Sequence, residues 1–212
     1  MFKAQFVVKV DPDPYPRSGS SVILLTKKDI PDFLNLQQQV WNELPLRKKD
    51  HLNVFSVQEL LDHLDAGMPL LAVRGEDGKL LAQGALSFPR DNKGRDYQQD
   101  HPMLQDYDDN ISFFESIAVR PDVASQHYGD MILAKGQELA MQQKSPGILA
   151  MASDEEVLGC GALERMGFIQ TECKIDYGID IPVVYAQWVK FGEGEERFMD
   201  PNNYPQYMYD IG

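Results

Sequence analysis

Apolar residues along the chain fall into short continuous runs and into longer segments with helical spacing. The short runs predict β-strands at residues 4–10, 21–26, 111–119, 147–153, 169–179 and 183–191. The longer segments, with apolar residues three and four positions apart, predict helices at 27–44, 56–67, about 129–143 and 154–168. Two further apolar runs flank Asp77 and Gly78, a pair that suits a tight turn, so residues 69–88 are expected to form an antiparallel hairpin. This order of elements predicts an α/β fold, a mixed sheet with helices on its faces.

The ends of the predicted helices carry residues that favour helix starts and stops. Asp29 is expected to cap the first helix, with Pro31 in its first turn. Gly67 and Gly167 are expected to end the second and the last helix. His63 lies among acidic residues of the second helix, and this part is predicted to be a solvated helix face.

The length and composition favour one domain with a tail. A chain of 212 residues with 43% hydrophobic residues can bury a sizeable core. Residues 1–190 are therefore expected to form a single domain, followed by an acidic, tyrosine-rich tail at 191–212. The tail would dock on its own subunit or on a neighbouring one, so a homodimer is left open. The polar stretch 90–110 is long for a plain connection and is expected to lie beside a site.

The charge balance argues against nucleic acid as a partner. The chain has 20 basic and 33 acidic residues, a formal net charge of −13, which repels a phosphate backbone. The same field would favour a cationic substrate, although an acidic balance also serves solubility. Residues 1–20 lack the pattern of a signal peptide and no apolar run reaches the length of a membrane span, so a cytoplasmic protein with no membrane contact is expected.

Cysteine and histidine residues give no pattern of a metal site. Cys160 and Cys173 are too far apart for a C-x-x-C unit and too few for a disulfide scaffold, which favours reduced thiols. No ligand spacing joins the histidines, which are His51, His63, His101 and His127. No structural metal is expected.

A strand, a short loop and a helix that begins near a glycine follow one another in "SIAVRPDVASQHYGDMILAKGQELA", residues 116–140. The first N–H groups of a helix have no intrahelical partner and carry partial positive charge, so they bind anions. Gly129 would keep a side chain away from those amides and let a phosphate approach. Competing nucleotide motifs are absent, because "GCGALE" has Glu164 at the third glycine position and no Walker sequence occurs. This stretch is the candidate anion site.

The segment "FFESIAVRPDVASQHYGDMILAKGQELA", the strand "GILAMAS" and the ending "ALERMGF" together resemble the GCN5-related N-acetyltransferases (GNAT). The motif of that family is a strand ending V-x-P, a loop, Q/R-x-x-G-x-G/A and a helix, and these positions here are Val119–Pro121 and Gln126–Met131. The likeness spans about residues 22–190, with the specific motif between 113 and 168. It implies a GNAT-like α/β fold, with a mixed, mostly antiparallel central sheet of about seven strands, splayed in the middle, and helices on both faces.

The resemblance also implies acetyl-CoA as co-substrate. The diphosphate would lie on the loop amides, and the pantetheine arm would add like a strand where the strand ending at Val119 splays from residues 147–153. Carried over residue by residue, the cofactor-binding positions are Ile117, Val119, Gln126, His127, Tyr128, Gly129, Asp130 and Met131. The sequence departs from the family in a longer loop at Asp122–Ser125 and in Met131, which replaces a small residue, so the coenzyme is expected to sit differently or to bind weakly.

Glu115 is the candidate catalytic base. It lies four residues before Val119, where many members of the family keep their base. By strand alternation it would share a face with Phe113, Ile117 and Val119. Amine acylation needs a neutral amine, so a base must collect a proton directly or through water. The alternative is a structural glutamate that bonds the neighbouring backbone.

The general acid for the thiolate is left open. Family members commonly have a tyrosine four residues before the glycine of the terminal "GF", and that position here is Leu163. Cys160, Tyr177, Tyr185 or water are the alternatives. Two functions therefore stay open. One is an N-acetyltransferase that moves the acetyl group of acetyl-CoA to a primary amine of a small molecule or peptide by direct attack. The other is a non-catalytic acyl-CoA-binding regulatory module of the same fold.

Overall fold

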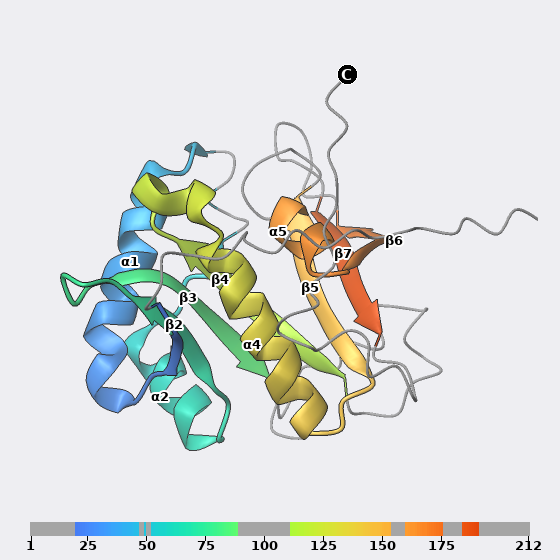
Figure 1. The fold of residues 1–212 in the computed structure, drawn as a ribbon, viewed down its shortest axis with the longest axis horizontal. Helices are drawn as coiled ribbons and strands as arrows, with labels where there is room; N and C mark the ends of the chain where they lie inside the picture. Colours follow the sequence, from blue (N-terminus) through green and yellow to red (C-terminus); the bar gives the residue numbers. More distant parts are fainter. Residues whose placement is uncertain are drawn as a thin grey trace, which may run out of the picture.

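A computed structural model describes residues 20–46, 49, 52–88, 111–153, 160–175 and 184–190 (Figure 1). Its helices are η1 Lys27–Asp29, α1 Ile30–Glu43, α2 Val57–Asp65, η5 Pro121–Gln126, α4 Tyr128–Gln142 and α5 Cys160–Arg165. Its strands are β1 Val22–Leu24, β2 Leu70–Arg74, β3 Leu80–Ser87, β4 Ser112–Val119, β5 Gly147–Ser153, β6 Ile169–Ile175 and β7 Val184–Lys190. The predicted strand at 4–10, the stretch 90–110 and the tail 191–212 lie outside the described residues.

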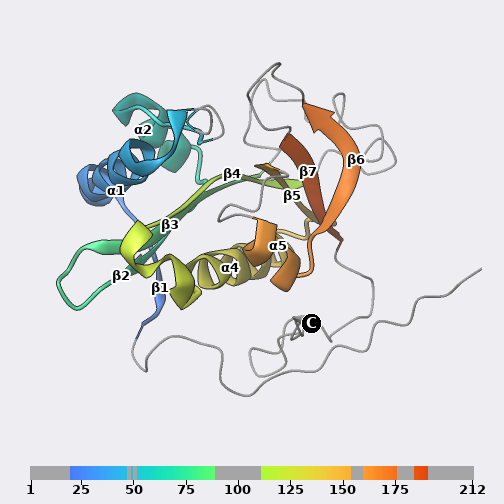
Figure 2. The ribbon, with the colours of Figure 1, turned by 90° about the horizontal axis from the view of Figure 1, so that it is seen from above.

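The strands form one sheet in the order β1-β2-β3-β4-β5-β7-β6. Neighbouring strands pair antiparallel everywhere except between β4 and β5, which run parallel. Figure 2 shows α1 and α2 over one face of the sheet and α4 and α5 over the other. The predicted mixed, mostly antiparallel sheet with helices on both faces is therefore confirmed. We call the two faces the α1 face and the α4 face.

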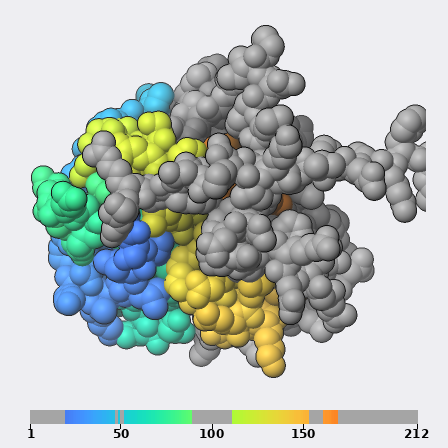
Figure 3. Space-filling view, in the orientation of Figure 1, coloured from blue at the N-terminus to red at the C-terminus, as the bar shows by residue number. Residues whose placement is uncertain are grey.

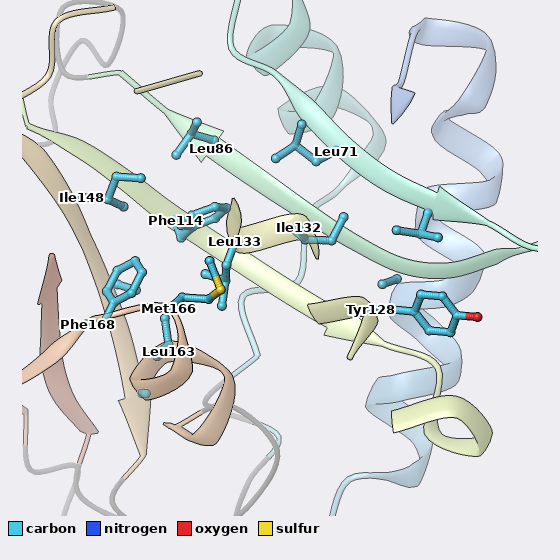
Figure 4. Close-up of a cluster of buried hydrophobic side chains, with 14 of the residues drawn as sticks. Leu71, Leu86, Phe114, Tyr128, Ile132, Leu133, Ile148, Leu163, Met166 and Phe168 are labelled. Atoms are coloured by element: carbon cyan, nitrogen blue, oxygen red, sulfur yellow. The ribbon is translucent and has the colours of Figure 1, made fainter. Parts of the chain in front are cut away.

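The α4 face is covered by a single apolar cluster in which α4 lies across β2, β3, β4 and β5. Phe114 of β4 lies in the middle of this cluster, and Leu163 and Met166 bring the α5 segment against Leu133 (Figure 4). Gly136 of α4 faces Phe114, because a Cβ there would lie 2.0 Å from the ring atom Cζ. The absence of a side chain at Gly136 thus lets the helix lie close to the sheet. In the space-filling view α4 (yellow) runs beside the blue N-terminal part of the described chain (Figure 3).

The α1 face carries a second apolar cluster, formed by α1, α2, β2 and β3 around Phe33, Phe55 and Leu60. The Gln37 side chain fastens α1 to the segment before α2, because its Nε2 donates to Phe55 O at 3.0 Å and its Oε1 accepts from Phe55 N at 2.9 Å. His63 is only 5% exposed and its ring lies edge-on to Phe55. The prediction of a solvated helix face is therefore wrong for His63, which follows Leu60 by one helical turn and points to the same apolar side.

The local signals at helix ends and turns are mostly confirmed. Gly67 (φ 77°) and Gly167 (φ 82°) follow the ends of α2 and α5 in the left-handed region, and Gly78 (φ 78°) lies in the turn of the β2–β3 hairpin. Asp29 does not cap α1 with its side chain. Instead its Oδ2 accepts hydrogen bonds from the Thr26 amide and hydroxyl, and its Oδ1 pairs with Arg74 at 3.1 Å.

Candidate active site at the β4–β5 split

The parallel strands β4 and β5 separate part of the way along their length. They pair at Ser112↔Ile148, Phe113↔Leu149 and Phe114↔Ala150, and no pairing joins them further along within the described residues. Beyond that point β4 pairs with β3 as far as Val119, and β5 pairs with β7 as far as Ser153. The predicted splay is confirmed, and it lies between the two strands expected from the sequence. We call this unpaired region the β4–β5 split.

Among the described residues, part of the backbone of β4 faces the split and pairs with no other strand. Arg120 N donates to Leu81 O at 2.8 Å, in register with the β3–β4 pairs. Along an antiparallel strand, the N–H and C=O groups of successive residues point alternately to one neighbouring strand and to the other. Every second residue counted from Arg120 therefore bonds to β3. Ile117 and Val119 therefore direct their N–H and C=O groups away from β3, toward the split.

The start of α4 offers further unpaired donors. The loop after β4 winds into η5, and His127 then takes a left-handed conformation (φ 59°) as the N-cap, with no side-chain cap hydrogen bond. The first amide of α4 that donates is that of Met131, to His127 O at 3.3 Å. Within the described part of the chain, the amides of Tyr128, Gly129 and Asp130 donate to no acceptor. This turn can bind an anion, because the N–H groups and the helix dipole act together.

Gly129 is buried, and a side chain at this position would point into the protein. A Cβ there would lie 3.3 Å from Val119 Cγ2 and 3.9 Å from the Cβ of Ala162. Beside the expected reason for this glycine, a clear path for phosphate, a second one is tight packing, because a Cβ would press on the Val119 side chain. As a result the free amides of α4 lie at the end of β4, where the β4–β5 split is open.

The side chains of the predicted coenzyme loop differ in exposure. Gln126 is exposed, His127 and Met131 are half-buried, and Tyr128 is buried with its hydroxyl pointing away from the apolar cluster (Figure 4). Met131 packs against the cluster on the α4 face. Any anion here would therefore be held mainly by the backbone.

Three basic residues near this turn, two arginines and a histidine, are bonded to carboxylates. Arg165 of α5 makes two bonds of 2.8 Å to the Asp130 carboxylate, and His127 Nδ1 lies 2.9 Å from Asp130 Oδ2. Arg120 bonds Asp122 of the lengthened loop at 2.6 Å. This hydrogen bond, aided by the nearby charge, raises the pKa of Arg120 against the opposing effect of burial.

A β-bulge places Glu115. Ser116 pairs with Ala85 and Phe114 pairs with the next residue, Leu86, so Glu115 is the extra residue in β4. The bulge reverses the alternation, because Phe114, Ile117 and Val119 all pack against the α4 cluster. The expectation that Glu115 shares a face with Ile117 and Val119 is therefore wrong.

Glu115 lies instead with Ser87 of β3, whose hydroxyl donates to its Oε1. Ser87 is two residues from Ala85, which belongs to the α1-face cluster, so it lies on the α1 face. The backbone donors at the start of α4 thus lie on the α4 face of the sheet, and the carboxylate of Glu115 lies on the α1 face.

The position expected for a general acid is apolar. Leu163 is 4% exposed and packs in the α4-face cluster with Met166 and Phe168. Cys160 begins α5, and Tyr185 of β7 pairs with Ala152 of β5. Tyr177 lies outside the described residues.

The described residues hold neither a membrane-spanning helix nor a cluster of metal-binding side chains. No helix in the described ranges is both long and apolar enough to cross a membrane. Nor does the described part of the chain bring together three His, Cys, Asp or Glu side chains that could hold a metal ion.

Known structures share this architecture. No family model matches the sequence, and no curated protein does. Among solved structures, the acetyltransferase of the GNAT family from Streptococcus pneumoniae is 12% identical, with a TM-score of 0.61, over 82% of this chain and 99% of that one. The fold is that of the GNAT acetyltransferases.

Two further acetyltransferase structures have a similar fold. The structure of yncA from Salmonella typhimurium, with its cofactor acetyl-CoA, is 12% identical, with a TM-score of 0.61, over 83% of this chain and 96% of that one. The ribosomal-protein-alanine N-acetyltransferase from Brucella melitensis is 16% identical, with a TM-score of 0.59, over 80% of this chain and 99% of that one. The GNAT-like fold class expected from the sequence is confirmed.

Some features of the site have no signal in the sequence. Ser87 and Arg165 are ordinary surface-type residues in the sequence and become part of the site only through β-pairing and helix packing. The bulge at Glu115 could not be predicted either, because nothing in "FFESIAV" marks an extra residue.

Proposed function

We propose that this protein is an acetyl-CoA-dependent N-acetyltransferase that acts on a primary amine of a small molecule or peptide by direct attack. One observation carries the proposal. The β4–β5 split opens beside the uncapped first turn of α4, and the two meet where Gly129 packs on Val119. An unpaired strand edge next to an anion-binding turn suits a ligand that joins a diphosphate to an amide-containing arm.

The amides of Tyr128, Gly129 and Asp130 would hold the diphosphate, because the Met131 amide of the expected set donates to His127 O. The backbone groups of Ile117 and Val119 would pair with the pantetheine arm. The structure of yncA with acetyl-CoA supports this choice of co-substrate, since that protein shares the fold. In the lengthened loop, the Asp122 carboxylate is bonded to Arg120.

The acceptor amine would approach from the α1 face. Glu115 would accept the proton that the amine loses as its nitrogen forms the new amide bond. A backbone N–H of Ile117 or Val119 would donate to the carbonyl oxygen while negative charge develops there. The thiolate of the coenzyme leaves as the second product and would take a proton from water or from a side chain, which gives the free thiol. The Brucella melitensis protein of the same fold is a ribosomal-protein-alanine N-acetyltransferase, which supports an amine as acceptor.

Two measurements test the proposal. Titration calorimetry should detect acetyl-CoA binding, and thiol release should rise above background with some amine in a panel of polyamines, amino acids and peptide N-termini. Failure to bind acetyl-CoA at millimolar concentration would overturn the proposal.

A regulatory module is the second candidate, favoured by the buried Leu163 at the position of the family's tyrosine. This reading expects acetyl-CoA binding without thiol release from any amine in the panel. Amine-dependent thiol release would overturn it.

A further inference from the structure

The Asp130 carboxylate stands in the first turn of α4, among the amides that the proposed function gives to the coenzyme diphosphate. We propose that Arg165 is a positioning residue that sets the affinity of this turn for the diphosphate, acting through its ion pair with Asp130. The proposal rests on the proposed function. It adds a role for a side chain on α5 that has no place in the chemistry itself.

In the Asp130–Arg165 pair, the guanidinium neutralises the buried carboxylate. The Asp130 side chain is 5% exposed, and Arg165 approaches it with both Nε and Nη2, each at 2.8 Å from a different carboxylate oxygen. His127 Nδ1 adds a contact of 2.9 Å to Oδ2. Bidentate geometry of this kind is the strong form of an arginine–carboxylate pair. Both oxygens of Asp130 are therefore occupied, and the carboxylate points toward α5.

The electrostatic consequence concerns the anion site. A helix start carries about half a positive charge, whereas an uncompensated carboxylate carries a full negative one. Without Arg165, Asp130 would cancel the field of the dipole and repel a diphosphate on the neighbouring amides. With Arg165 in place, the pair is neutral and the amides keep their attraction for anions.

The same helix also fixes the position of the turn. Ala162 of α5 faces Gly129, and Arg165, three residues further along α5, bonds Asp130. Residues three apart lie on one side of a helix, so one face of α5 contacts both residues of the α4 turn. Arg165 thus joins α5 to the turn that would bind the diphosphate.

The competing explanation is a purely structural ion pair, and the two explanations differ in the sign of one effect. A structural pair loses both stability and coenzyme affinity when either partner is changed. Under the proposal, Asp130→Asn lowers stability but tightens acetyl-CoA binding, because it removes the negative charge that lies among the amides of the turn.

The experiment measures acetyl-CoA affinity by calorimetry and thermal unfolding in parallel, for the full chain and four variants. We expect Arg165→Met to weaken binding about tenfold and Asp130→Asn to tighten it about threefold, on the scale of one charge pair in a partly solvated site. The double variant D130N/R165M should return to within about twofold of the unaltered protein, since it restores a neutral pair. Arg165→Lys, which keeps the charge but not the bidentate contact, should fall between Arg165→Met and the unaltered protein.

Each outcome decides between the explanations. Unchanged affinity in a folded Arg165→Met, or weaker binding in Asp130→Asn, overturns the proposal. If Arg165→Met does not fold, the opposite shifts expected of Arg165→Lys and Asp130→Asn decide the matter. An unaltered protein that binds no acetyl-CoA refutes the proposed function, and this result is distinct from one in which the unaltered protein binds and the variants bind equally well.

Discussion

Ser87 of β3 and Glu115 of β4 are joined by a hydrogen bond across the bulge that interrupts these two strands. Ser87 is fully buried and Glu115 is half-buried. The hydroxyl donates and the carboxylate accepts, so the bond holds the carboxylate in one orientation. A carboxylate held in a fixed orientation is what a base for amine acylation requires.

Glu115→Gln should lower kcat/KM for the amine by about a hundredfold to a thousandfold, because an amide cannot accept the proton. The affinity for acetyl-CoA should stay unchanged, since Glu115 lies on the α1 face. Glu138→Gln is the matched control, because Glu138 pairs with Lys135 on α4, away from the bulge. Initial rates at neutral and high pH provide the measurement. Equal rates for Glu115→Gln and the unaltered protein at both pH values would remove Glu115 as the base.

Ser87→Ala should lower kcat/KM about tenfold near neutral pH, the scale of one hydrogen bond to a charged group. The affinity for acetyl-CoA should stay unchanged, because Ser87 lies on the α1 face. Ser87→Thr keeps the hydroxyl and should restore the rate. An unchanged kcat/KM in Ser87→Ala would show that Ser87 has no part in positioning the base.

The order of elements and the place of the split could be predicted because their signals are local. Apolar runs and helical spacing mark the strands and helices within windows of a few residues. The motif from Val119 to Met131 is continuous in the sequence, so it marks the turn of α4 and the strand beside it. The left-handed Gly67 and Gly167 likewise lie next to the helices that they end.

The features that could not be predicted depend on distant parts of the chain. A prediction from strand alternation assumes that successive side chains point to opposite faces, and a bulge adds one residue that nothing in the sequence marks. The prediction therefore places Glu115 on the same face as Ile117, whereas the two lie on opposite faces. Asp130 and Arg165 are 35 residues apart and meet only when α5 packs on α4. His63 sits among acidic residues in the sequence, yet the apolar side of α2 is the side that carries it.

The surroundings of Asp29 lower the pKa of its carboxyl, so the stability of the fold should depend on pH in the acidic range. Burial alone would raise the pKa of its carboxyl, but hydrogen bonds from Thr26 and the charges of Lys28 and Arg74 outweigh burial and lower it. The ionised carboxylate therefore stabilises the fold above the unfolded-state pKa of about 3.9, and this stability is lost as the pH falls through the lower folded-state pKa.

Asp29→Asn should consequently be less stable than the unaltered protein at pH 6, with a difference that shrinks below about pH 4. Urea unfolding at several pH values measures this difference. The matched control is Asp65→Asn, an exposed partner of Lys27 at the end of α2. A difference that stays constant down to about pH 2 would contradict the assigned cause.

Gly129→Val should lower both stability and coenzyme affinity, because the new side chain would press on Val119 and Ala162 and move the α4 turn from the end of β4. Overpacking of this kind costs about 1–3 kcal/mol in the free energy of unfolding. Gly136→Ala is the control, because Gly136 lies in α4 seven residues after Gly129 and its new Cβ would meet the Phe114 ring. This variant should lose stability while keeping its affinity for acetyl-CoA. The added change Val119→Ala should recover part of the loss in Gly129→Val. If both glycine variants lose affinity in proportion to stability, then general destabilisation, and not the position of the turn, controls coenzyme binding.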